Sequence, residues 1–117
     1  MKDDRLFLIH VHECMGRIAQ YTADGRDAFL ADTKTQDAVI RNLQILAESA
    51  PMLSEQLRQA HPEIDWRGIR GFRNVVVHDY LGVDIRTIWD IVERDLPPLR
   101  AAIAGMLKST GGAPDTP

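Results

Sequence analysis

One stretch decides the fold, and it reads Ala38-Val-Ile-Arg-Asn-Leu-Gln-Ile-Leu-Ala-Glu-Ser-Ala50. Its apolar residues recur at the spacing of one broad helical face: Val39, Ile40, Leu43, Leu46 and Ala47. The other side of the same helix is polar, with Asp37, Arg41, Gln44 and Glu48. Such a helix is stable only when other helices cover its apolar face. The stretch therefore predicts a helical core, and we expect Thr35 to cap the helix.

Helical periodicity extends from this stretch to both ends of the chain. We expect helices from Asp3 or Asp4 to about residue 23, near 28–31, over 35–50, from Pro51 to about 60, from Trp66 toward Gly82, and from Asp84 onward with a kink at Pro97-Pro98. Asp65 and Asp84 are the expected caps of the last two helices. The fold class is therefore all-α, an up-and-down bundle of five to six helices.

Two short features could argue against this interpretation. The run Val75-Val76-Val77 resembles a strand, but a lone short strand has no partner to pair with. Gly68 and Gly71 are poor helix formers, and we expect them to allow a neighbouring helix to approach closely.

Length and composition indicate a single domain. The chain has 117 residues, of which 44% are hydrophobic and 26% charged, as in globular proteins. We expect a helical domain over residues 1–108 and a disordered tail over 109–117, where Gly, Pro, Ser and Thr dominate. No apolar run approaches the roughly 20 residues of a membrane span. One cysteine and a charged amino-terminal segment favour a cytoplasmic protein without a membrane association.

Basic residues are concentrated in one segment although the net charge is −3. Residues 66–83 hold Arg67, Arg70 and Arg73 against Asp79 alone. Arginine binds phosphate through its planar fork, although three arginines on a helix are also typical of a solvated face.

A metal site is not expected. His10 and Cys14 share a helical face beside Glu13, but His12 points away and structural zinc needs four converging ligands. The chain also lacks a nucleophile elbow and a glycine-rich phosphate loop, so we expect no cofactor.

The stretch Trp66–Tyr80 combines polar residues at helical spacing. Asn74 and His78 are four residues apart and share a face, while Arg73 and Tyr80 are seven apart. A histidine that titrates near neutral pH, beside a permanently charged arginine, is sufficient for phosphodiester cleavage. The spacing alone favours a solvated or interface polar face over a catalytic one.

Arg73-x-x-x-x-His78-x-Tyr80 resembles the signature of HepT-like toxins of the HEPN superfamily. The resemblance covers residues 4–107, because further blocks follow in the same order: Ala38–Ala50, Trp66–Tyr80, Val83-Asp84, Ile88–Val92 and Asp95–Pro97. One departure is Ala47-Glu48-Ser49, where the family often has Gly before the Glu and Ala after it. The role of Glu48 is therefore open.

The resemblance implies a homodimeric, metal-independent RNA endonuclease. Arg73, Asn74 and His78 would be its catalytic residues. Arg67 and Arg70, from the basic segment 66–83, are expected to bind the RNA. It further implies a type VII-like toxin–antitoxin pair, in which a minimal nucleotidyltransferase (MNT) antitoxin attaches AMP to Tyr80. Two histidines across a two-fold axis could then divide the roles of base and acid.

Two other functions remain compatible with the sequence. The chain could be the non-catalytic subunit of a two-component nucleotidyltransferase, binding its substrate or nucleotide through the same polar edge. It could also be a helical DNA-binding module that uses Arg67, Arg70 and Arg73, although its net charge of −3 disfavours that class.

Overall fold

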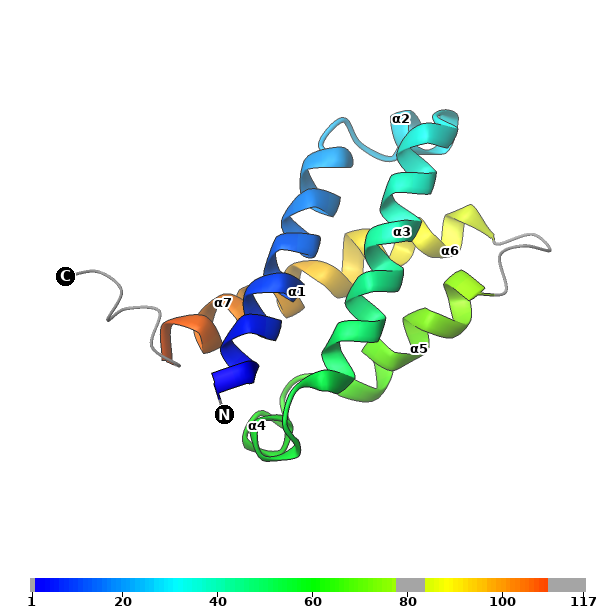
Figure 1. Ribbon diagram of the computed structural model, residues 1–117. Helices are drawn as coiled ribbons and strands as arrows, with labels where there is room; N and C mark the ends of the chain where they lie inside the picture. The colour runs from blue at the N-terminus through cyan, green and yellow to red at the C-terminus, as the bar shows by residue number, and fades with distance from the viewer. Residues whose placement is uncertain (1, 78–83, 110–117) are drawn as a thin grey trace.

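A computed structural model describes residues 2–77 and 84–109, and every regular element in these two ranges is helical (Figure 1). The elements are α1 (Lys2–Tyr21), α2 (Arg26–Ala31), α3 (Thr33–Ser49), the 3-10 turn η1 (Ala50–Met52), α4 (Glu55–Ala60), α5 (Trp66–Val77), α6 (Ile85–Asp90), the π-helical turn η3 (Ile91–Asp95) and α7 (Leu96–Leu107). The predicted all-α bundle is confirmed. The strand-like Val75-Val76-Val77 lies at the end of α5.

Helix α3 lies at the centre of the bundle. It packs along α1 on one side and along α5 on another, and α1 and α3 run in opposite directions (Figure 1). Helix α7 packs against α1. The predicted apolar face of α3 is buried, with Val39, Leu43 and Leu46 fully enclosed. Helices α2, α5 and α7 therefore each pack against α3 or α1, while α6 packs against η3 and α2.

Of the predicted helix caps, Asp65 and Asp84 are confirmed. Asp65 accepts a hydrogen bond from the Gly68 amide at 2.9 Å, and Asp84 accepts one from the Arg86 amide at 3.0 Å. The prediction of Thr35 as a cap is wrong, because α3 begins two residues earlier. Asp32 caps it, accepting from the Lys34 amide at 3.0 Å and from the Thr35 hydroxyl at 2.8 Å.

Pro51 is placed differently from the prediction, and the irregular backbone expected at Pro97-Pro98 lies just before these residues. Pro51 lies in the short turn η1 and not in the first turn of α4, which Ser54 caps. Pro97 and Pro98 do not break the last helix, because they occupy the first turn of α7, where a missing amide hydrogen costs little. The backbone adjusts just before them through η3, so α6, η3 and α7 follow one another without a gap.

Asp4 connects two ends of the fold. The sequence suggested it as a cap, but it lies inside α1 and is only 7% exposed. Its carboxylate accepts hydrogen bonds from the Ser54 amide at 2.8 Å and the Ser54 hydroxyl at 2.7 Å. The same hydroxyl accepts a bond from the Leu57 amide at 3.1 Å and so caps α4. Burial alone would raise the pKa of Asp4, but these hydrogen bonds, together with the positive charge of the amino terminus, outweigh it and hold the pKa below its ordinary value.

Replacement of this carboxylate should destabilise the protein in a pH-dependent way. We expect Asp4→Asn to lower the free energy of unfolding by about 1–3 kcal/mol at neutral pH, because bonds to a charged acceptor are lost. The folded pKa is depressed, so this contribution is complete above the ordinary carboxyl pKa and disappears as the pH falls through the folded value. Denaturant unfolding from pH 7 to pH 3 should show the two proteins converging in acid. Exposed Asp37→Asn is the control, and a constant difference at every pH would contradict this account.

Candidate functional site

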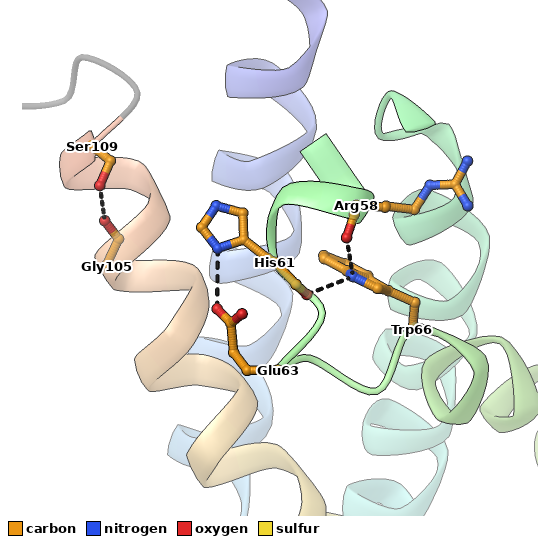
Figure 2. Close-up of polar contacts among 6 residues, drawn as sticks. All are labelled: Arg58, His61, Glu63, Trp66, Gly105 and Ser109. Carbon is orange, nitrogen blue, oxygen red and sulfur yellow. Dashed lines mark hydrogen bonds and ion pairs between the residues drawn. The ribbon is translucent and has the colours of Figure 1, made fainter. Parts of the chain in front are cut away.

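Helix α5 presents an arginine-rich face because its apolar face is fixed against α3. Ile69, Phe72 and Val76 are buried in the core. The start of the helix is held by Trp66, whose indole Nε1 donates to the Arg58 carbonyl at 3.0 Å and the His61 carbonyl at 3.1 Å (Figure 2). These contacts fix the rotation of α5 about its axis, and thereby the direction of its polar side.

The polar side of α5 forms one wall of a groove of about 710 Å³. The other wall comes from the end of α3 and from η1. The lining residues are Ala47, Glu48, Pro51, Arg67, Arg70, Gly71, Arg73 and Asn74. Four of the α5 residues follow the spacing i, i+3, i+4 and i+7 of a single helical face.

The groove is the described hollow best suited to a polyanion. Three arginines face one glutamate across it, and the arginine side chains are exposed. A second hollow of about 460 Å³, between α5 and α7, has a rim of Glu63, Asp65 and Asp95 with Arg94. A third, of about 280 Å³ between α1 and α7, is mainly apolar. The acidic rim of the second hollow would repel phosphates, whereas the groove would attract them.

The structure brings together four of the six predicted site residues. Arg67, Arg70, Arg73 and Asn74 all line the groove. His78 and Tyr80 lie outside the described residues. The catalytic, RNA-binding and modification roles of all six remain predictions.

Four lining residues were not predicted to belong to the site: Ala47, Glu48, Pro51 and Gly71. Gly71 was expected to allow a close helix contact, but a Cβ built there would meet nothing within 4 Å. Gly71 instead lines the groove without a side chain, so the groove is open at this position. Its place beside Arg67, Arg70 and Asn74 on one helical face was a signal in the sequence. A Cβ at Gly68 would collide with the Asp65 carboxylate, so this glycine accommodates the helix cap.

Glu48 is the acidic residue of the groove. Its Oε2 accepts a hydrogen bond from the Gln44 Nε2 at 3.5 Å, one turn earlier on α3. Within residues 2–77 and 84–109 this is the one hydrogen bond that Glu48 makes, and no ion pair links it to the groove arginines. The carboxylate is therefore available to a ligand on the wall opposite the arginines.

The histidine–cysteine segment of α1 does not converge on a site. Cys14 is fully buried, and burial raises the pKa of its thiol, whereas His10 is exposed. Among the described residues no group of three or more metal-ligating side chains comes together. None of the described helices combines the length and the apolar character needed to cross a bilayer.

The fold and the groove define an all-α bundle with an anion-attracting face, and comparison with known proteins identifies its family. The model of the "Ribonuclease HepT-like" family matches residues 11–106. The chain therefore belongs to the HepT-like ribonuclease family.

Relatives over nearly the whole chain agree with this assignment. "Putative RNase MJ0127" of Methanocaldococcus jannaschii is 37% identical over 112 residues, which is 95% of this chain and 93% of the relative. "Probable ribonuclease HepT" of Thermococcus cleftensis is 35% identical over 103 residues, 87% of this chain and 94% of the relative. "Putative RNase TTE0752" of Caldanaerobacter subterraneus is 29% identical over 109 residues, which is 92% of this chain and 97% of the relative. No solved structure matches the chain significantly.

Proposed function

We propose that this protein is an endoribonuclease that binds its RNA strand in the groove between α3 and α5. The observation that carries the proposal is the convergence of Arg67, Arg70, Arg73 and Asn74 on one groove, in a chain of the HepT-like ribonuclease family. Arg67 and Arg70 hold phosphates on either side of the scissile bond. Their guanidinium groups stay charged at any physiological pH and can engage phosphate oxygens in pairs.

Cleavage proceeds by attack of a ribose 2′-hydroxyl on the adjacent phosphorus. His78 removes the proton from that hydroxyl, and its ordinary pKa near 6.5 suits this task. Arg73 stabilises the negative charge that builds up on the phosphoryl oxygens in the transition state. Asn74 precedes His78 by four residues in the sequence and orients the phosphate or the imidazole. The attacking group belongs to the substrate and the charge is met by arginine, so the reaction needs no metal ion.

The active form is a homodimer. One motif histidine per chain cannot act comfortably as base and acid in the same turnover, whereas two across a two-fold axis can divide these roles. Arg70 and Arg73 are exposed, so they are accessible to a second copy of the chain.

The protein acts as the toxin of a type VII-like pair. An MNT-type antitoxin transfers AMP to Tyr80, two residues beyond His78. Each AMP adds about one negative charge and a bulky base, which would compete with the substrate phosphate for Arg73. This control follows from the resemblance to HepT-like toxins.

The first test is the dependence on ribose. We expect the purified protein to cut RNA in EDTA and to leave DNA of the same sequence intact, because DNA lacks the attacking hydroxyl.

Arg73→Lys should lose most activity, roughly a hundredfold or more, since the positive charge stays but the planar guanidinium, which can donate two parallel hydrogen bonds, is lost. Arg26→Lys, at an exposed position on α2, is the matched control and should stay fully active. Cleavage of the DNA would exclude the mechanism. Intact RNA with the wild-type protein would favour the alternative function, a non-catalytic binding subunit of a minimal nucleotidyltransferase.

A second test uses a substitution that narrows the groove. Gly71→Leu places a side chain where a Cβ has nothing within 4 Å, so it should fill the groove without disturbing the core. Leucine favours helix over glycine by roughly 0.5–1 kcal/mol, so the melting temperature should hold or rise. RNA cleavage should fall by at least tenfold. Gly105→Leu, at an equally open position on α7, is the control and should leave cleavage unchanged. Full activity of Gly71→Leu would show that the RNA lies elsewhere.

The modification is tested on the tyrosines. After incubation with the antitoxin and ATP, we expect intact-mass analysis to show AMP on the wild type and on Tyr21→Phe, but not on Tyr80→Phe. Tyr80→Phe should still cut RNA, because its phenol is not the proposed base, and should resist inhibition. Tyr21 is exposed on α1 and therefore serves as a matched phenol. AMP on Tyr21, or no gain in mass, would contradict this control mechanism.

A further inference from the structure

The wall of the groove opposite the arginines has its own chemistry. Arg67, Arg70 and Arg73 account for the phosphates of an RNA strand, but they do not explain Glu48. A carboxylate repels phosphate, so it weakens RNA binding unless part of the strand donates hydrogen bonds to it. An ionised carboxylate is acceptor-only and can take two donors side by side.

The space beside Glu48 suits a flat group. Gly71 leaves the floor bare, with nothing within 4 Å of an added Cβ. Exposed Pro51 lines the same side of the groove with an apolar ring, whereas Ala47 is buried in the core. Single-stranded RNA presents unstacked bases that proteins read along their Watson–Crick edges. A base can therefore enter this part of the groove while its phosphate stays with the arginines.

We propose that Glu48, with Gly71 and Pro51, forms a guanine-selective base subsite. This inference rests on the proposed RNA substrate. Guanine carries two adjacent donors on its Watson–Crick edge, N1–H and the N2 amino group, and these match the two carboxylate oxygens. Adenine and cytosine each pair one amino group with a ring nitrogen that accepts, and the single donor of uracil lies between two carbonyls. Guanine is thus the base that satisfies Glu48 without repulsion.

The test removes the N2 amino donor from the base, by replacing guanine with inosine, and the carboxylate acceptor from the protein, by Glu48→Ala. The probes are two short 2′-O-methyl RNAs, identical except that one has guanine where the other has inosine, which lacks the N2 amino group. The proposed mechanism cannot cut 2′-O-methyl RNA, so affinity is measured without cleavage. We expect the wild type to prefer the guanine probe by about fivefold or more, as for a good base contact. Glu48→Ala should bind both probes equally.

The matched control is Glu55→Ala. Glu55 also bonds a glutamine one turn away, Gln59 at 3.1 Å, is exposed, and does not line the groove. Both variants remove one negative charge. Any general gain in RNA affinity from this lost charge is therefore the same in both and can be subtracted from the effect of Glu48→Ala. Glu55→Ala should keep the full preference for guanine.

Sequencing the cut sites in a random RNA pool gives the second readout. Wild type and Glu55→Ala should show guanine at one fixed position, and Glu48→Ala should lose that preference while still cutting. Equal binding of both probes by the wild type, or an unchanged preference in Glu48→Ala, would overturn the subsite. If the wild type binds neither probe and cuts no RNA, the proposed function fails, which is a different result from a lost base preference.

Discussion

Burial of the apolar face of α3 determines how the core of the bundle packs. Leu43 and Leu46 are fully enclosed, and α3 packs along both α1 and α5. Burial of one such side chain contributes about 1.5–3 kcal/mol, so rotating or shifting α3 would be costly. The same rotation places Glu48, on the polar side of α3, in the groove with the arginine face of α5. The packing of the core thus determines which polar residues meet at the surface.

Much of this fold could be predicted because helical periodicity is a local property of the sequence. The apolar faces of α3 and α5 and the caps Asp65 and Asp84 were found from spacing and residue type. The errors arose where the outcome depends on the tertiary fold. Asp4 has the residue type of a cap, but in the folded chain its partner is Ser54, fifty positions away. No local pattern reveals such a pairing.

The candidate site could be predicted on one helix but not across two. Arg70, Arg73 and Asn74 belong to α5, and their shared face follows from helical geometry. The opposite wall comes from the end of α3 and from η1, and only the packing of α3 on α5 brings Glu48 and Pro51 there. Gly71 was misjudged for the same reason, because its role depends on the absence of a neighbour. A groove is a property of pairs of elements, whereas sequence spacing describes single elements.

In the proposed reaction the groove arginines stabilise the negative charge of the transition state, and the substrate itself supplies the nucleophile. The most direct measurement of this claim is mass spectrometry of the ends of the RNA fragments released in EDTA. Attack by the 2′-hydroxyl predicts a 2′,3′-cyclic phosphate on one fragment and a 5′-hydroxyl on the other. A 5′-phosphate and a free 3′-hydroxyl would show that water was the nucleophile, and would contradict the account.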